Sequence, residues 1–248
     1  MLIEKNDKLV EIECDKCVIV GDLHGDYKTF SKIIKLIRKD VVIIFLGDYA
    51  DRGEHGVEII EKINELIEKN KNIIALKGNH ESYSKNGIPN FSPCDLINEV
   101  EIKRGNWNEY FNNFLINFIN KLHISAILNN KFLLVHGGIS LKIKNRNNLS
   151  NPEEKIEEDI LWSDPFDGNG EQPNPRGAGV LFGKDVTETI CKRLNVEKII
   201  RSHEPYKAIN GIFYEHEKKV LTINSTSLYG TEPFVTIIEK EFIKEIFL

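Results

Sequence analysis

Aspartate, histidine and asparagine side chains recur directly after apolar runs along this chain. Three early runs end in Gly21-Asp22-Leu23-His24-Gly25, in Gly47-Asp48-Tyr49-Ala50-Asp51-Arg52-Gly53 and in Gly78-Asn79-His80-Glu81. Two later runs end in His136-Gly137-Gly138 and in Arg201-Ser202-His203-Glu204. Ligands of α/β sheets bind where the carboxyl ends of strands converge, so we expect these side chains to meet at one site.

Each motif alone has an ordinary explanation, because Gly-Asp and His-Gly are common turn dipeptides and Asn79 could cap a helix. Their joint occurrence at strand ends favours a functional site. The candidate metal ligands offer oxygen and imidazole atoms without thiolate: Asp22, His24, Asp48, Asn79, His136 and His203. This set is typical of manganese, iron or zinc. Six ligands are too many for one tetrahedral zinc ion but fit two divalent ions that share a carboxylate and a water.

Apolar runs and helical periodicity predict the elements that must position these residues. Strands are predicted at Cys17–Val20, Val41–Leu46 and Asn72–Leu76, because each run is short, apolar and rich in β-branched residues. Apolar residues at helical spacing predict helices over 30–37 and 57–67. The first third of the chain therefore predicts a β-α-β-α-β unit.

The rest of the chain predicts a helical segment and a second sheet. The stretch from about Ser92 to Leu128 has the pattern of helices, and the Gly-, Pro- and Asn-rich stretch from Pro165 to Gly183 predicts a long surface loop. Six further runs predict strands, several of them antiparallel: 132–135, 198–201, 211–214, 220–223, 234–238 and 242–247. We expect one α/β catalytic domain over residues 1–248, with two mixed sheets packed face to face and helices outside.

Composition excludes several classes of protein. Lys and Arg number 33 against 38 Asp and Glu, a net charge of −5, so we expect neither nucleic acid nor an anionic membrane as a partner. The apolar run Val41–Leu46 is far shorter than the ~20 residues of a membrane span, and no leader pattern follows Met1, so we expect a cytoplasmic protein. The spacing of Cys14 and Cys17 matches half a zinc site, but the second pair is missing, and reduced thiols are expected.

The motifs together resemble the PPP family of metal-dependent serine/threonine protein phosphatases, within the calcineurin-like metallophosphoesterases. Besides the five strand-end motifs, the chain contains Leu161-Trp162-Ser163-Asp164-Pro165, Pro175-Arg176-Gly177-Ala178-Gly179 and Phe182-Gly183. The resemblance covers nearly the whole chain. It implies the calcineurin-like β-sandwich, a compact catalytic core of prokaryotic type, and hydrolysis of phosphomonoesters on phosphorylated proteins.

The resemblance also implies how the six candidate ligands divide between two ions. Asp22 and His24 would hold the first ion, and Asp48 would bridge both. The second ion would be held by Asn79, His136 and His203. A hydroxide bridging the two ions would attack phosphorus directly, without a covalent phosphoenzyme.

Four other residues are implied to act on the substrate. His80 would be the general acid that protonates the departing alkoxide, and Asp51 would accept a hydrogen bond from it and keep it cationic. Arg52 and Arg176 would bind phosphate oxygens with their planar donor groups. Glu81 is expected to order its loop by pairing with an Arg or Lys, or to be a charged turn residue.

One departure from the family and three alternatives remain open at this point. Leu228 stands where eukaryotic members carry a tyrosine above the site, and Tyr229 follows one residue later. This change leaves open whether a tyrosine of this loop contacts the phosphate, and whether the protein also hydrolyses phosphotyrosine. A symmetrical diadenosine tetraphosphate hydrolase shares the first three motifs, but Trp162 and Arg176 favour a protein phosphatase. A binding scaffold that has lost catalysis should show gaps among the ligands, and here every one is present.

Overall fold

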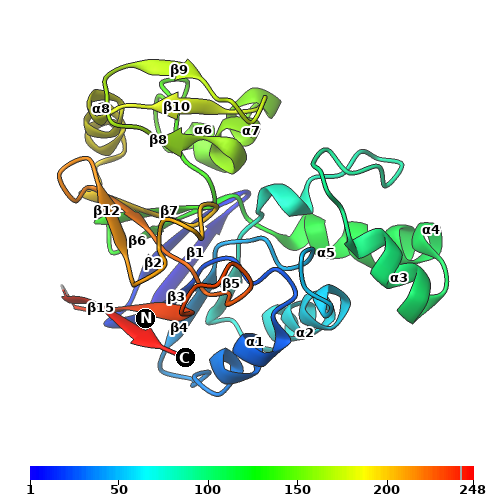
Figure 1. Ribbon diagram of the computed structural model, residues 1–248. Helices are drawn as coiled ribbons and strands as arrows, with labels where there is room; N and C mark the ends of the chain where they lie inside the picture. The colour runs from blue at the N-terminus through cyan, green and yellow to red at the C-terminus, as the bar shows by residue number, and fades with distance from the viewer. Residues whose placement is uncertain (241) are drawn as a thin grey trace.

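Two large mixed sheets and one small sheet make up the computed structural model, which describes residues 1–240 and 242–248 (Figure 1). The five-stranded sheet has the order β15-β14-β3-β4-β5 and consists of β3 (Lys16–Val20), β4 (Val42–Phe45), β5 (Ile73–Ala75), β14 (Phe234–Glu239) and β15 (Phe242–Phe247). The seven-stranded sheet has the order β1-β2-β6-β7-β11-β13-β12 and consists of β1 (Leu2–Asn6), β2 (Leu9–Glu13), β6 (Ser125–Leu128), β7 (Phe132–Val135), β11 (Lys198–Arg201), β12 (Phe213–Glu215) and β13 (Val220–Thr222).

Helices cover the outer faces of the two sheets. The helical elements are α1 (Tyr27–Ile34), α2 (Gly56–Lys69), η1 (Asn79–Glu81), α3 (Leu96–Arg104), α4 (Trp107–Tyr110), η2 (Phe111–Leu115), α5 (Ile116–Lys121), α6 (Asn147–Ser150), α7 (Glu154–Trp162) and α8 (Lys184–Leu194). No helix in the described residues is long and apolar enough to cross a membrane. The arrangement is the predicted α/β sandwich, with the β-α-β-α-β unit over β3, α1, β4, α2 and β5.

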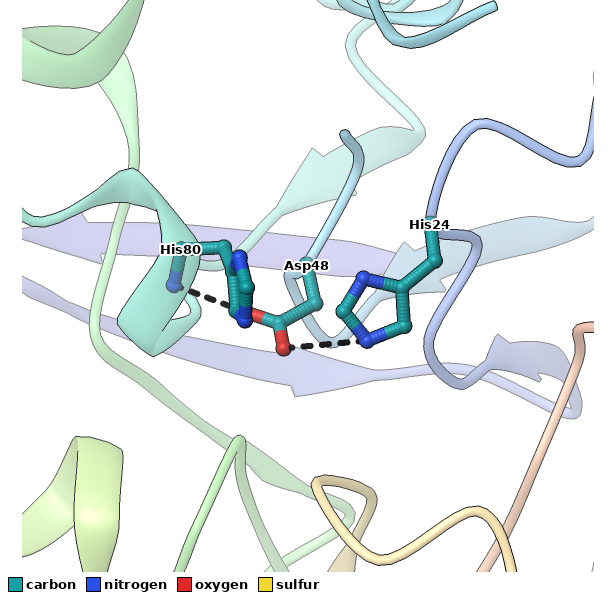
Figure 2. Close-up of side chains that lie close together, drawn as sticks. All are labelled: His24, Asp48 and His80. Atoms are coloured by element: carbon teal, nitrogen blue, oxygen red, sulfur yellow. Dashed lines mark hydrogen bonds and ion pairs between the residues drawn. The ribbon is translucent and has the colours of Figure 1, made fainter. Parts of the chain in front are cut away.

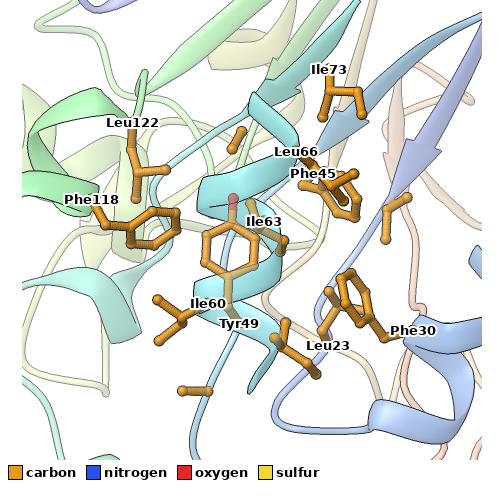
Figure 3. Packing of buried hydrophobic residues seen from close by; sticks show 14 of the residues in the cluster. Leu23, Phe30, Phe45, Tyr49, Ile60, Ile63, Leu66, Ile73, Phe118 and Leu122 are labelled. Atoms are coloured by element: carbon orange, nitrogen blue, oxygen red, sulfur yellow. The ribbon is translucent and has the colours of Figure 1, made fainter. Parts of the chain in front are cut away.

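Three apolar clusters hold these layers together. The inner cluster lies between the two large sheets and includes Ile19, Ile44 and Leu134. A second cluster joins the five-stranded sheet to the helices α1 to α5, where Phe45 of β4, Tyr49 from the loop after β4 and the α2 residues Ile60 and Ile63 pack together (Figure 3). The third cluster joins the seven-stranded sheet to α7 and α8 and includes Leu133, Ile160, Phe182 and Ile190. Such burial gives about 25 cal/mol per Å² of apolar surface removed from water.

Parallel pairing brings the ends of the site-bearing strands to one edge of the sandwich. Val20 of β3 pairs with Phe45 of β4, and Phe45 pairs with Ala75 of β5, so these three strands end at the same level. In the seven-stranded sheet β7 and β11 are also parallel, with Leu134 opposite Ile200. The loops that leave these five strands carry all five strand-end motifs.

The structure corrects two sequence-based expectations about the elements and adds one hairpin. Ser125–Leu128 is strand β6 and not the end of the helical segment, because it pairs with both β2 and β7. The expected loop at 165–183 contains part of a three-stranded sheet formed by β8 (Asp164–Pro165), β9 (Glu171–Pro173) and β10 (Val180–Phe182). The hairpin of β1 and β2, in which β1 is largely exposed and β2 largely buried, was not predicted from the sequence.

Candidate metal centre

Buried carboxylates and imidazoles from both large sheets meet at the edge where β3, β4, β5, β7 and β11 end. Asp48 lies at the centre, with Oδ2 3.5 Å from His24 Nε2 and Oδ1 3.4 Å from His136 Nε2. Asp48 belongs to two groups of three side chains, and within each group the possible ligand atoms all lie within 4.8 Å of one another. The first group is His24, Asp48 and His80, and the second is Asp48, His136 and His203. Figure 2 shows Asp48 between His24 and His80.

The remaining two sequence-predicted ligands also lie in this cluster. Asp22 Oδ2 is 3.8 Å from His24 Nε2, while Asp22 Oδ1 accepts the backbone N–H of His203 at 3.1 Å. Asn79 Oδ1 lies 2.9 Å from His136 Nε2. The structure thus brings together all six side chains that the sequence identified as candidate ligands.

Backbone carbonyls orient two of the imidazoles with a lone pair facing the cluster. His24 Nδ1 lies 3.0 Å from the oxygen of Ala50, and His136 Nδ1 lies 3.0 Å from the oxygen of Leu46. A carbonyl oxygen only accepts, so in each ring Nδ1 carries the hydrogen and Nε2 is free to coordinate. Burial lowers the pKa of both His24 and His136 to about 4, which keeps the rings in the neutral form that binds metals.

The donor set fits divalent ions. Asp22 Oδ2 and His203 Nε2 are buried and have no hydrogen-bond partner among the described residues, which is costly unless another group occupies that position. Burial and the neighbouring charges of Asp22 and Glu81 raise the pKa of Asp48 well above its usual range despite the opposing effect of His80, so a further positive charge beside Asp48 would stabilise its carboxylate. Cations bound between Asp22, Asp48 and His203 would satisfy all three side chains.

Backbone geometry around the cluster is unusual. Five residues of the site have a left-handed backbone, with φ between 47° and 71°: His24, Asp48, Asp51, Arg52 and His203. Such a conformation costs about 1–3 kcal/mol for a residue other than glycine and persists only when its surroundings fix it. Gly78 allows the close approach of two loops, because a Cβ there would lie 2.2 Å from Asp48 Oδ1. The fold therefore holds the site in a strained arrangement.

Glu81 fixes two of these loops in a way that differs from the sequence-based expectation. Its carboxylate accepts the backbone N–H groups of Asp48 at 2.9 Å, Tyr49 at 3.0 Å and Gly78 at 2.8 Å. The expectation that Glu81 orders its loop is correct, but its partners are backbone amides and not an Arg or Lys. Glu81 joins the loop after β4 to the loop after β5.

His80 and Asp51 form a buried hydrogen-bonded pair beside the cluster. His80 Nδ1 and Asp51 Oδ2 are 2.6 Å apart. Burial favours the neutral imidazole, but the charge of Asp48 and the hydrogen bond to Asp51 outweigh it and raise the pKa of His80 to about 9. At neutral pH His80 therefore carries a proton that it can donate.

The two arginines reach the site from different segments. Arg52 follows Asp51 directly and is exposed, and its side chain contacts Tyr229. Arg176 lies in the loop between β9 and β10 of the small sheet, where its Nε donates to Asp164 Oδ2 at 2.7 Å. Asp164 Oδ1 lies 4.0 Å from His203 Nε2, so this contact holds Arg176 near the cluster.

Sequence reasoning assigned no role to Asp164 or Arg201. Arg201, fully buried at the end of β11, donates from Nη2 to Asp164 Oδ1 at 2.8 Å and from Nη1 to Glu204 Oε2 at 2.6 Å. It also donates to the backbone oxygen of Gly137. The signal in the sequence was an arginine at the end of the short run Lys198–Arg201, with Glu204 three residues later, because a buried arginine requires acidic partners.

Tyr229 reaches the site although it stands one residue later than the family pattern. Its ring lies edge-on to that of His24, with centroids 5.8 Å apart, and burial raises its pKa to about 12. The loop is anchored by Asp26, whose Oδ2 accepts from the backbone N–H of Ser227 at 2.9 Å and from its hydroxyl at 2.7 Å. The Asp26 carboxylate also caps α1 by accepting the N–H of Thr29.

Replacing Asp26 with Ala is expected to lower the free energy of unfolding by about 2 kcal/mol, since a helix cap and a pair of hydrogen bonds each contribute about 1 kcal/mol. Urea unfolding measures this loss, and amide hydrogen exchange should accelerate in the loop from Ser227 to Gly230. Ser31→Ala on the exposed face of α1 is the control and should change neither. Unchanged exchange in the loop of the Asp26 variant would contradict its anchoring role.

Comparisons with known proteins identify the family. The sequence profile of the calcineurin-like phosphoesterase family matches residues 16–207, and the chain belongs to this family. It is 31% identical over 223 residues to a serine/threonine-protein phosphatase of Caenorhabditis elegans, a match that covers 85% of this chain and 47% of that protein. The chain spans about half the length of the curated relatives it matches.

Solved structures share the fold. A protein serine/threonine phosphatase from Saccharomyces cerevisiae matches with a TM-score of 0.81 and 24% identity, covering 98% of this chain and 84% of that one. A cold-active protein tyrosine phosphatase matches with a TM-score of 0.68 and 16% identity, covering 98% and 81%. The predicted calcineurin-like fold is thereby confirmed, and the family implies divalent metal ions at the cluster.

Proposed function

We propose that this chain is a protein serine/threonine phosphatase, with residues 1–248 as a single catalytic domain acting in the cytoplasm on phosphorylated proteins. The observation that carries the proposal is the position of Asp48, which belongs to both groups of ligand atoms and lies next to the His80–Asp51 pair. A phosphatase of this type needs this combination of a shared carboxylate and an adjacent acid. The names of the relatives support serine/threonine specificity.

The proposed ligand assignment is the one that the family resemblance implies, and the short distances from Asp48 to His24 and to His136 support it. Asp22 and His24 would hold one ion and Asp48 would be shared, and the other ion would be held by Asn79, His136 and His203. The ions supply a water of lowered pKa for attack and positive charge for the phosphate oxygens. We propose Mn²⁺ as the metal, with iron or zinc as alternatives, because oxygen and imidazole ligands without thiolate suit these ions.

The protein's own groups bind the phosphate and protonate the leaving group. Arg52 and Arg176 would bind phosphate oxygens from two sides, and Asp164 orients Arg176. His80 would give its proton to the serine or threonine oxygen as the P–O bond breaks, and Asp51 would stabilise the cation before transfer. Tyr229, next to His24 and Arg52, would limit the space above the phosphate.

A substrate panel tests this function against its alternatives. Phosphoserine and phosphothreonine peptides should release phosphate faster than phosphotyrosine peptides, and diadenosine tetraphosphate should be a poor substrate. Rapid turnover of the dinucleotide without turnover of phosphopeptides would refute the proposal. The likeness to a tyrosine phosphatase is at the level of fold, and the panel also measures whether this chain has a broader specificity.

Removal of the metal ions gives a separate prediction. Dialysis against a chelator should abolish phosphate release, because the ions contribute several kcal/mol to transition-state stabilisation. Added Mn²⁺ should restore activity more fully than Zn²⁺ or Mg²⁺, and thermal melting should show binding independently of turnover. Full activity after exhaustive chelation, with elemental analysis showing no metal, would contradict the assignment.

A further inference from the structure

The turn that carries Asp51 and Arg52 is held from outside the metal centre. Both residues have a left-handed backbone, with φ of 69° and 71°. Two adjacent non-glycine residues of this kind require fixed surroundings, as argued above. The loop after β3 supplies part of the support, since the N–H of Gly53 donates to the oxygen of His24 at 2.9 Å. The remaining contacts come from α3.

The first turn of α3 binds both residues of the turn. Asp51 Oδ1 accepts the backbone N–H of Asp95 at 2.6 Å and that of Leu96 at 2.8 Å. In return, Asp95 Oδ2 accepts the backbone N–H of Arg52 at 3.1 Å. Asp51 therefore uses one carboxylate oxygen for His80 and the other for α3. Arg52 is held through its backbone N–H, while its side chain is exposed and contacts Tyr229.

One helical turn further along, Glu99 holds the other end of the same segment. Glu99 is 8% exposed, and its two oxygens accept the N–H groups of Gly56 at 3.0 Å and Val57 at 2.9 Å. These are the first amides of α2, whose N-cap residue His55 makes no capping hydrogen bond with its own side chain. Glu99 thus provides the cap that the sequence of α2 does not.

Lys103, another turn along α3, completes this set of contacts. Its Nζ donates to Glu99 Oε1 at 3.0 Å and to the backbone oxygen of Glu54 at 2.6 Å. The residues that contact the segment 51–57 are therefore spaced four apart on one face of α3, which places them in a row along the helix. This row spans the whole segment from the acid pair to the start of α2.

We propose that Glu99 and Asp95 are positioning residues for catalysis, which fix the 51–57 segment so that the Arg52 side chain is held at the phosphate. The inference rests on the proposed function, because it assigns these residues to the binding of the same phosphate. Small displacements of a substrate-binding group can cost ~100-fold in rate, so a loosened turn should reduce activity without removing any group that touches substrate.

A double-mutant cycle tests the proposal. Glu99→Ala is expected to lower kcat/KM for a phosphoserine peptide by about tenfold or more. In the Arg52→Ala background the same substitution should change kcat/KM by less than about twofold, since the group that it positions is already absent. Equal losses in both backgrounds would overturn the proposal, because general destabilisation acts on both alike.

Glu61→Gln is the matched control, because it weakens the paired contact of Glu61 with Arg104, at 2.8 and 2.7 Å, between the same two helices. It should leave kcat/KM unchanged. A loss equal to that of Glu99→Ala would overturn the proposal. If Glu99→Ala does not fold, exposed Asp95 provides the test: Asp95→Ala should lower kcat/KM, and Asp95→Asn, which keeps an acceptor oxygen for the Arg52 N–H, should restore it.

Amide hydrogen exchange separates this inference from the proposed function. The amides of Arg52, Gly56 and Val57 should exchange at least about tenfold faster in Glu99→Ala than in the wild-type protein, while those of α2 beyond its first turn stay protected. If the wild-type protein releases no phosphate from phosphopeptides, the proposed function fails. Unchanged exchange at these amides would refute the positioning role whatever the substrate.

Discussion

Asp48→Asn is expected to lose bound metal and to reduce phosphate release by about 1000-fold or more. Asn has the same shape and tolerates a left-handed backbone, so the substitution removes the shared charge and leaves the loop intact. Loss of the several kcal/mol that metal ions supply corresponds to this factor, at about 1.4 kcal/mol for each tenfold change. Elemental analysis and turnover of a phosphoserine peptide measure the two effects.

The thermal stability of the Asp48 variant provides an independent readout. Without metal, the buried carboxylate of Asp48 is costly, so Asp48→Asn should melt no lower than the metal-free wild type. The rise in Tm that added metal produces in the wild type should be lost. Asp159→Asn is the control: Asp159 is equally buried but pairs with Lys142, and its variant should keep its metal. Normal metal content in Asp48→Asn would refute the central position of Asp48.

His80→Asn is expected to slow hydrolysis according to the leaving group. With a phosphoserine peptide kcat should fall by about 1000-fold, within the usual contribution of general acid catalysis. With an aryl phosphate whose phenol is acidic, the loss should be about tenfold or less, because such a leaving group departs without a proton. Rates over a series of substituted phenyl phosphates measure this dependence. The plot of log kcat against leaving-group pKa should have a steeper slope for the variant than for the wild type.

Two controls distinguish loss of the acid from loss of structure. The His80 variant should retain metal, and His123→Asn should have wild-type kinetics, since His123 lies outside the site and contacts the backbone oxygen of Asp7. Asp51→Asn should show the same leaving-group dependence as His80→Asn with a smaller loss, because the 2.6 Å contact supports the cation. A uniform loss across all leaving groups would show that His80 is not the acid.

The sequence was sufficient to predict the central unit of the fold and the members of the metal cluster. Runs such as Val41–Leu46 are apolar throughout, and polar ligands at their ends are visible without a structure. Ser125–Leu128 was assigned wrongly, because a four-residue apolar run does not distinguish a strand from the end of a helix. The small sheet lies in a segment of turn residues, where local pattern predicts a loop.

What the sequence could not predict are contacts between segments distant along the chain. The role of Glu81 depends on three amides, two of them more than 30 residues away, and backbone amides carry no sequence signal. The sequence left open whether Tyr229 reaches the site, because it stands one residue later than the tyrosine of the family pattern. Its approach to His24 depends on the hydrogen bonds that anchor Ser227 on Asp26. Such contacts depend on how loops that are distant along the chain meet in the folded protein.

The left-handed backbone at His24, Asp48, Asp51, Arg52 and His203 also determines how a saturation mutagenesis experiment would look. Asn and Gly adopt this conformation readily, whereas β-branched residues pay the largest steric penalty there. At these positions Asn and Gly should yield inactive protein in normal amounts, and Val or Ile should yield little protein. Comparing abundance with activity across the substitutions would therefore separate the chemistry of each side chain from the conformation of its backbone.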